Sequence, residues 1–496
     1  MDLGRREIEE IDEELGRKDK AEEGQDEVGL SPGSLLFLEP GTNCCIIAVI
    51  GCKTNIDPGI VKEGLKQTLV HHPRFSSKLQ VINGVKRKWL KTEVDLDNHV
   101  IVQQVDTQME SPSQFIEDYI SNLTTTPVDS SKPLWELRIL NLKTPEAEAV
   151  AILRIHHSIG DGMSLISSLF ACCRKSSDPG ALPTIPMQKQ TDRPRNRRGV
   201  LWLLLSVWSV LRLILNTLVD ISLFMATILF MKDTKTPLKG LSGVEHNPKR
   251  IVHLTVSLDD IKLVKNAMAV TVNDVILGVM QAGLSRYLNR KYGEVDKSKS
   301  NNLPRHFRLR ATVLVNIRQA IGIQAIADMM KKKSKAKWGN KLGFICFPFT
   351  IALPLDPLDY IRQAKTIADR KKLSLLALCT YVINNCVVKL FGSKVSSCLA
   401  YRIFFNTTMS ISNVVGPVEE ISFFGHPIAF IAPTVYGHPQ ALTVHFQSYI
   451  NKMSIVVTVD PNVIPDPHLL CDDFSESLKL FKDAIILNNS VIANSN

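Results

Sequence analysis

Several features that would mark a specialised class of protein are missing from this chain of 496 residues. Charged residues make up 22% and hydrophobic residues 45%, a balance that excludes a wholly disordered, collagen-like or polytopic membrane protein. Aromatic residues make up only 6%, and no helix-turn-helix, zinc-finger or RNP pattern occurs. We therefore expect a globular protein without a nucleic acid partner.

The ten cysteines show neither C-x-x-C spacing nor a nearby histidine at the spacing of a metal site. They include the adjacent pairs Cys44–Cys45 and Cys172–Cys173, and the others are scattered. We expect buried thiols in a reducing compartment, no disulfides and no metal. The N-terminus is acidic where a secretory signal needs a basic start and an apolar run, so we expect no signal peptide.

Acidic residues are concentrated in the first 28 positions, where 12 acidic and 5 basic side chains give a net charge of −7. The whole chain carries +10, so the remainder carries +17. A basic body favours an anionic partner, such as a membrane surface or a phosphorylated cosubstrate. Because its few apolar residues are scattered among charges, residues 1–28 are expected to form an acidic disordered tail.

Short apolar runs alternate with helix-like stretches, which is typical of a mixed α/β protein. We expect strands over residues 44–50, 137–140, 150–155, 251–256, 309–315 and 454–459. We expect helices over residues 60–70, 113–123, 163–173, 273–288 and 357–371. The length predicts two domains of ordinary or larger size. They are expected at residues 29–190 and 241–496, joined by a basic and apolar linker or membrane segment at residues 191–240.

The segment 191–240 begins with four arginines, at Arg193, Arg195, Arg197 and Arg198. Residues 200–231 are overwhelmingly apolar, with interruptions mainly at Arg212, Asn216 and Asp220. The apolar length exceeds the about 20 residues of a membrane span, but each interior charge costs about 2.5–3.5 kcal/mol in a bilayer. Three interpretations stay open: an embedded or interfacial helix pair beside a polybasic anchor, a single span, or a buried helix that links the domains.

The strongest chemical signal is the heptad His156-His157-Ser158-Ile159-Gly160-Asp161-Gly162, which follows a predicted strand and precedes a predicted helix. This is where α/β folds place functional groups. A histidine is suited to take a proton from a hydroxyl group near pH 7. No G-x-S-x-G pattern occurs, so the sequence gives no support to a serine acyl-enzyme. The alternative is a pair of structural histidines followed by a helix-capping aspartate.

This heptad resembles the H-H-x-x-x-D-G signature of the acyl-CoA-dependent acyltransferases related to chloramphenicol acetyltransferase, in particular the wax ester synthase/diacylglycerol acyltransferase family. Four further segments resemble motifs of that family in the same order: Pro133-Leu134-Trp135, Val272-Asn273-Asp274-Val275, Leu314-Val315-Asn316-Ile317-Arg318 and Ser412-Asn413-Val414-Val415-Gly416-Pro417. The resemblance extends from about Ser31 to the C-terminus and is greatest to the plant branch.

The resemblance implies that His157 is the catalytic base and that His156 supports it. It implies that Asp161 is structural and pairs with an arginine, for which we predict Arg318. Gly162 is expected to permit a backbone conformation or a close approach that a side chain would block. The other predicted support residues are Asn273, Asp274, Ser412 and Asn413. For Asn273, a role as helix N-cap stays open beside a role in positioning the substrate.

The resemblance further implies two chloramphenicol-acetyltransferase-like α/β domains, with the active site at their interface. Acyl-CoA is the expected cosubstrate, and no bound cofactor is expected. A long-chain fatty alcohol accepts the acyl group to give a wax ester, as found in cuticular wax, and diacylglycerol accepts it to give triacylglycerol. Because both acceptors dissolve in bilayers, we expect attachment to the endoplasmic reticulum membrane, or to the plasma membrane, with the catalytic domains in the cytosol.

Two alternatives to this function are kept. One is a soluble acyltransferase of the H-x-x-x-D type that acts on phenolic or alkaloid alcohols, although the chain lacks the D-F-G-W-G segment of that class. The other is a lipid-binding homologue without activity.

Overall fold

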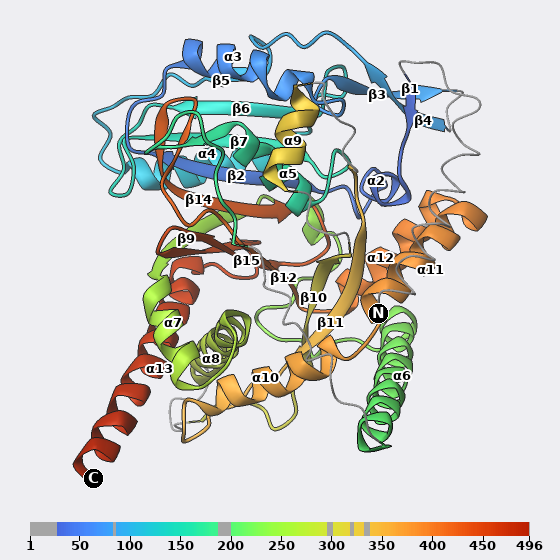
Figure 1. The fold of residues 1–496 in the computed structure, drawn as a ribbon, viewed down its shortest axis with the longest axis vertical. Coiled ribbons are helices and arrows are strands. Elements are labelled where there is room, and N and C mark those ends of the chain that lie inside the picture. The colour runs from blue at the N-terminus through green and yellow to red at the C-terminus, as the bar shows by residue number, and fades with distance from the viewer. Residues whose placement is uncertain are drawn as a thin grey trace.

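The structure is a computed structural model that describes residues 27–82, 86–186, 200–294, 301–317, 322–331 and 338–495. Two β-sheets dominate it, and helices cover them (Figure 1). The predicted α/β class is therefore confirmed. Most of the predicted acidic tail, the arginines at positions 193–198 and Arg318 lie outside the described residues.

The first sheet has seven strands in the order β5-β6-β7-β2-β14-β13-β8. Their bounds are Val100–Val102 (β5), Trp135–Leu140 (β6), Ala149–His156 (β7), Cys45–Cys52 (β2), His426–Tyr436 (β14), Ile421–Phe423 (β13) and Cys173–Lys175 (β8). The helices of this half are α2 (Pro32–Leu36), α3 (Pro58–Gln67), α4 (Pro112–Thr125) and α5 (Gly162–Ala171), with a short 3-10 turn at Leu69–His71. A separate small sheet combines β1 (Glu27–Gly29), β4 (Lys86–Lys91) and β3 (Ser77–Ile82).

The second sheet has six strands in the order β11-β10-β12-β15-β16-β9. Their bounds are Leu342–Phe349 (β11), Leu309–Asn316 (β10), Met409–Val414 (β12), Leu442–Tyr449 (β15), Lys452–Val459 (β16) and Arg250–Ser257 (β9). Its helices are α7 (Leu258–Ala267), α8 (Val272–Gly293), α10 (Asp359–Lys372), α11 (Leu376–Phe391), α12 (Ser393–Asn406) and α13 (Pro467–Ser495). A 3-10 turn (Val244–His246) precedes β9, and α9 (Ile323–Met330) packs against the core of the first sheet.

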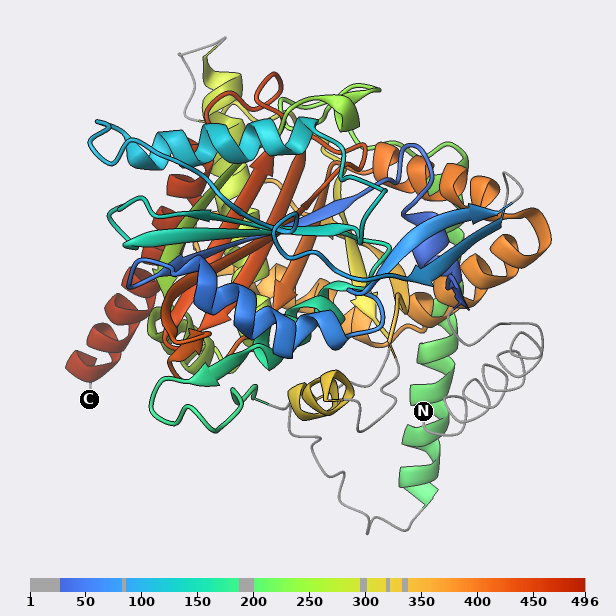
Figure 2. The same ribbon diagram turned by 90° about the horizontal axis from the view of Figure 1, so that it is seen from above.

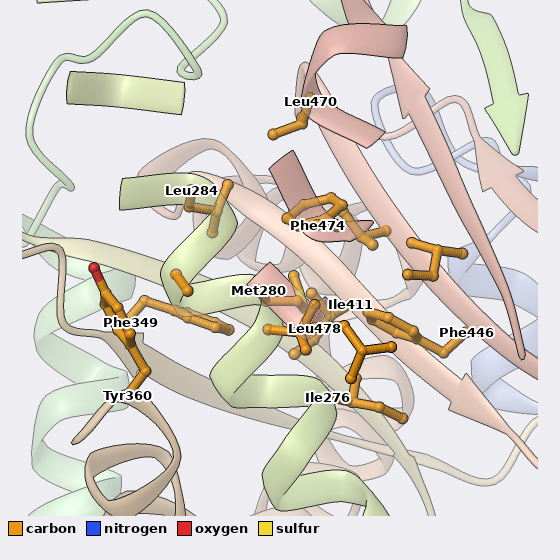
Figure 3. Packing of buried hydrophobic residues seen from close by; sticks show 14 of the residues in the cluster. Ile276, Met280, Leu284, Phe349, Tyr360, Ile411, Phe446, Leu470, Phe474 and Leu478 are labelled. Atoms are coloured by element: carbon orange, nitrogen blue, oxygen red, sulfur yellow. The ribbon is translucent and has the colours of Figure 1, made fainter. Parts of the chain in front are cut away.

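The core of the second half lies between this sheet and helices α8 and α13. Met280 and Leu284 of α8 face Phe474 and Leu478 of α13, and Ile411 of β12 closes the cluster from the sheet (Figure 3). Burial of such side chains stabilises the fold by about 1.5–3 kcal/mol each. The second sheet is thus apolar on its helix-covered face.

Every predicted strand and helix is present, with changes at the ends. The predicted helix 163–173 ends at Ala171, because Cys173 begins β8 and pairs with Phe423 of β13. Strands β13 and β14 are not among the predicted elements. Pro427 and Pro433 lie inside β14, and proline argues against an interior strand because it cannot donate a backbone hydrogen bond.

Strand β14 joins the two halves of the chain. It comes from the C-terminal half, yet it pairs antiparallel with β2, from Tyr436 opposite Cys45 to Ile428 opposite Cys52. The partner β2 is the central strand of the first sheet and pairs with β7 on its other side. The first sheet is therefore completed only by strands β13 and β14, which lie in the sequence between β12 and β15 of the second sheet.

The apolar segment forms one continuous helix, α6 (Val200–Leu229), which projects from the body (Figure 2). The expected helix pair is therefore wrong, because no glycine or proline breaks the segment. By length and composition, Leu204–Leu229 could cross a membrane, and most of its residues are not buried.

The join between β2 and β14 gives the first prediction. A Cβ atom on Gly51 would lie 2.2 Å from the ring of Phe430 in β14, so Gly51→Ala must displace a buried side chain. We expect a loss of about 1–3 kcal/mol in the free energy of unfolding, measured by urea denaturation. The matched control is Gly322→Ala, whose Cβ would contact no described residue. Equal stability of the two variants would contradict the proposed packing.

Candidate active site

His157 lies directly after β7, where its backbone is fixed from two sides. Its N–H donates to the carbonyl of Cys44 at 2.9 Å, and Asn340 Nδ2 donates to its carbonyl at 3.0 Å. Its imidazole stacks on Phe37, with ring centroids 3.9 Å apart. His157 is thus held by two segments that are distant from it in sequence, residues 37–44 and Asn340.

The imidazole of His157 is buried, and burial lowers its pKa from the ordinary value. The nearby charge of Asp161 acts in the opposite direction, because it favours the protonated ring. At neutral pH the ring is therefore uncharged, which is the form that can accept a proton. Within the described part of the chain, Nδ1 has no hydrogen-bond partner. Such buried unpaired atoms are uncommon and often functional.

His156 differs from its neighbour because both of its ring nitrogens are used. The backbone N–H of Ser158 donates to Nδ1 at 3.2 Å, so Nδ1 is an acceptor. Nε2 then carries the proton and donates to Asn43 Oδ1 at 2.7 Å. Burial lowers the pKa of this ring to about 3. These are the contacts of a structural histidine.

Asp161 begins helix α5 as its N-cap. Oδ1 accepts from the Ser164 N–H at 2.9 Å, and Oδ2 accepts from the backbone N–H of Lys341 at 3.4 Å. The side chain is fully buried. These contacts tie the heptad to the segment that precedes β11. The pairing with Arg318 stays a prediction, since Arg318 lies outside the described residues.

The prediction that Gly162 permits a special backbone conformation or a close approach is wrong within the described part of the chain. Its φ is not in the left-handed region, and a Cβ on it would contact nothing within 4 Å in the described part of the chain. The close approach occurs at Gly160, where a Cβ would lie 2.9 Å from the indole of Trp338. That indole donates to the carbonyl of Ile159 at 2.7 Å, so Gly160 lets the tryptophan lie on the heptad.

Asn273 and Asn413, two of the predicted support residues, contact each other. Asn413 Nδ2 in β12 donates to Asn273 Oδ1 in the first turn of α8 at 2.5 Å. The N-cap of α8, however, is Thr271, so the N-cap role considered for Asn273 is wrong. Thr271 and Asp274 form a capping box, in which each side chain accepts from the other's backbone N–H. The spacing of Thr271 and Asp274 was the missed signal.

The strand alternation separates Ser412 from Asn413. Ile411 lies in the helix-covered core, so Asn413 shares that face and Ser412 points to the other. Ser412 is in register with His445 of β15. Burial lowers the pKa of His445 to about 4, and the charge of a protonated His157 lowers this pKa further. Burial lowers the pKa of His438 to about 3, and the charge of a protonated His157 also acts to lower it. The second sheet therefore brings a polar face toward His157.

The sequence did not point to five residues of this site: Phe37, Asn340, Trp338, His438 and His445. None carries a local pattern, because each reaches the heptad only through the fold. The only signal for His438 and His445 in the sequence is that each is an isolated histidine outside the motifs.

The buried histidines predict how stability depends on pH. The pKa values of His72, His156 and His438 fall to about 3, and that of His445 to about 4. Between pH 6.5 and these values the unfolded state binds more protons than the folded state, so stability falls as pH drops through this window. Each such group contributes a slope of about 1.4 kcal/mol per pH unit.

We expect the thermal midpoint to decrease steadily from pH 6.5 to 4.5 in differential scanning fluorimetry. His445→Asn removes one titrating group and should make the decrease shallower. A midpoint that does not change over this range would contradict the burial of these rings.

Comparisons with known proteins agree with this fold and arrangement. Residues 59–276 match the model of the wax ester synthase/diacylglycerol acyltransferase catalytic domain, and residues 338–482 match that of the WS/DGAT C-terminal domain. Wax ester synthase/diacylglycerol acyltransferase 11 of Arabidopsis thaliana is 52% identical over 95% of this chain and 97% of its own. Wax ester synthase/diacylglycerol acyltransferase 5 of Arabidopsis thaliana is also 52% identical, over 93% of this chain and 95% of its own.

Solved structures share the fold at lower identity. The wax ester synthase/diacylglycerol acyltransferase from Marinobacter aquaeolei VT8 superimposes with a TM-score of 0.57 at 16% identity, over 92% of this chain and 100% of that chain. The first condensation domain of the calcium-dependent antibiotic synthetase gives a TM-score of 0.57 at 13% identity, over 92% and 97%. The expected fold is therefore confirmed, and this chain belongs to the wax ester synthase/diacylglycerol acyltransferase family and is an acyltransferase.

Proposed function

We propose that this chain transfers a long-chain acyl group from acyl-CoA to a long-chain fatty alcohol, and also to diacylglycerol, with His157 as the general base. The observation that carries the proposal is the neutral, buried imidazole of His157, whose Nδ1 has no partner among the described residues. Membership of the family supports the substrate classes. The products are a wax ester and a triacylglycerol.

In this mechanism His157 takes the proton of the acceptor hydroxyl as its oxygen attacks the thioester carbonyl carbon. The C–S bond of the resulting tetrahedral intermediate then breaks, and the imidazolium returns the proton to the departing CoA sulfur. The reaction leaves an ester and free CoA, and the histidine is unchanged. The charge of Asp161 favours the imidazolium that forms between the two proton transfers. General base catalysis of this kind contributes about 10²–10⁴-fold.

The choice of His157 over His156 follows from their hydrogen bonds. To act as a base, His156 would have to give up its bond with the Ser158 N–H, which already occupies the lone pair of Nδ1. The proposed supporting residues are His156, Asp161, Asn273, Asp274, Ser412, Asn413 and Arg318. Of these, Asp161 is supported by its N-cap position, and Asn273 and Asn413 are supported by their mutual hydrogen bond.

We further propose that α6 attaches the enzyme to a membrane by entering one leaflet without crossing the bilayer. Its amino-terminal half is covered by large exposed side chains: Leu204, Leu205, Val207, Trp208, Val210, Leu211, Ile214 and Leu215. The stretch from Leu204 to Leu215 is about 18 Å long, whereas the hydrocarbon core of a bilayer is about 30 Å thick. Inserted alone, it reaches into one leaflet.

The carboxyl-terminal half of α6 is docked on the protein by polar contacts. Asp220 Oδ1 accepts from Arg370 at 2.7 Å and from Lys371 at 2.9 Å. Thr217 Oγ1 accepts from the Leu375 N–H, and Thr227 Oγ1 accepts from Arg310. Breaking a buried ion pair costs about 3–5 kcal/mol, which argues against withdrawal of this half into a bilayer. These contacts favour interfacial attachment over a span and over a fully buried linker.

The proposed location is the endoplasmic reticulum membrane, with the catalytic sheets on the cytosolic side where acyl-CoA is available. The plasma membrane is the second candidate location.

The base is tested with isolated membranes that contain the protein and receive radiolabelled acyl-CoA, a long-chain alcohol and diacylglycerol. The parent should form labelled wax ester and labelled triacylglycerol. His157→Ala should lose about 10²–10⁴-fold in both, because proton transfer is lost. His156→Ala is the matched control and should lose less per folded molecule. Near-normal ester formation by His157→Ala would rule out the mechanism.

The attachment is tested by fractionation. The parent should remain with microsomes through a high-salt wash and be released by detergent, because apolar insertion is not screened by salt. Replacing Leu204, Leu205, Trp208 and Leu211 with serine should release the protein. The control replaces the exposed Leu480, Ile486 and Leu487 of α13 with serine and should stay bound. Recovery of the parent in the soluble fraction at ordinary salt would identify α6 as a linker without membrane contact.

A further inference from the structure

A cavity of about 260 Å³ lies between the docked half of α6, the start of β10, strand β11 and the end of α10. One part of its wall is apolar, with Phe224, Met231, Phe349 and Leu376 among the lining residues. The other part is polar and is lined by Asp220, Arg308, Arg310, Arg370 and Lys371. The guanidinium group of Arg310 is already bonded to Asp233, to Thr227 and to two backbone carbonyls. An amphipathic wall of this kind suits a ligand with a polar head and an apolar tail.

The polar part contains a carboxylate that lacks one partner. Asp220 is buried, and its Oδ1 is used by Arg370 and Lys371. Its Oδ2 is also buried but accepts no hydrogen bond within the described part of the chain. A buried acceptor without a donor costs about 1–3 kcal/mol. Because Asp220 also lines the cavity, a ligand whose donor comes within reach of Oδ2 would be stabilised there.

This missing donor distinguishes between ligand classes. A phosphate or carboxylate head group has only acceptors when ionised, so it could use the cations but would leave Asp220 Oδ2 unpaired. A hydroxyl group can donate to Asp220 Oδ2, and its oxygen can accept from the ammonium group of Lys371. A neutral hydroxyl head group can therefore pair with both Asp220 and Lys371, whereas an anionic head group can pair only with the cation.

The cavity also reaches the exposed apolar surface of α6. Leu223 lines it and is 43% exposed. Leu211, Leu215, Val219 and Leu223 are all exposed and are spaced four residues apart, which places them along one side of the helix. This stripe leads from the half that we assign to the bilayer to the rim of the cavity.

We infer that this cavity is a second lipid site, which binds a long-chain alcohol taken from the bilayer. The inference rests on the proposed function, because the acceptor alcohol is the hydroxyl lipid that the enzyme uses. The hydroxyl lies at Asp220 and Lys371, and the chain lies against Phe224, Met231 and Phe349 and extends along the stripe. The site is separate from the heptad and would hold the acceptor before it reaches His157.

The test uses the full chain in detergent with a long-chain alcohol that carries a diazirine near the hydroxyl end. After irradiation, labelled peptides are identified by mass spectrometry. We expect label on residues that line the cavity. Unlabelled alcohol of the same length should suppress labelling at least tenfold more effectively than the matching carboxylate or alkane, because a hydrogen bond to a charged group is lost. Equal competition by the carboxylate would indicate an anion site, and equal competition by the alkane an unspecific crevice. Either result overturns the inference.

Two variants on α6 form a matched pair. Leu223→Trp fills the rim and should reduce labelling of the cavity at least tenfold. Leu218→Trp changes an exposed leucine that does not line the cavity and should leave the labelling unchanged. Unchanged labelling in Leu223→Trp would overturn the inference. Asp220→Asn should weaken labelling about tenfold. If this variant does not fold, the tryptophan pair still decides.

Labelling and turnover separate this inference from the proposed function. His157→Ala should be labelled like the parent, although its ester formation falls about 10²–10⁴-fold. A parent that forms ester but shows no alcohol-specific label on the cavity would overturn the second site alone. A parent that is labelled there but forms no ester from any alcohol would overturn the proposed function and, with it, the role of the cavity as an acceptor site.

Discussion

Strand β14 pairs with β2 over nearly its whole length, and the placement of the heptad at residues 156–162 follows from this pairing. Cys45 of β2 lies opposite His156 of β7 on one side and opposite Tyr436 of β14 on the other. The chain then turns at Gly437, where φ is +99° and a Cβ would lie 2.3 Å from the carbonyl oxygen of Asn43. Only glycine fits this position without strain.

The turn at Gly437 leads directly from the first sheet to β15 of the second. His438 and His445 therefore come near His157 because of the strand register. Thr434 of β14 contacts His445 Nδ1 at 3.2 Å and Thr458 of β16 at 2.6 Å, so hydroxyl groups connect the two sheets at this point. Burial keeps these imidazoles neutral. The charge of Asp161 then favours the protonated form of His157.

Periodicity and motifs were sufficient to predict the two α/β units and the strand and helix around the heptad. These are local patterns, or patterns tied to a family. Residues such as Phe37 and Asn340 could not be predicted, because their contacts with His157 depend on topology alone. Gly162 was mistaken for the restricted glycine because the two glycines of the heptad look alike in sequence, and only the position of Trp338 distinguishes them. Strand β14 was missed because its prolines are unusual beside a central strand.

The exchange of β14 also has a consequence for biosynthesis. Strand β2 leaves the ribosome early, whereas β14 begins only at His426. During most of translation the nascent chain must therefore carry an unpaired edge on the strand that will become the centre of the first sheet. Exposed edges of this kind promote association with other chains. Protection of the β2 edge until the last part of the polypeptide arrives is thus a requirement for the productive folding of this enzyme in the cell.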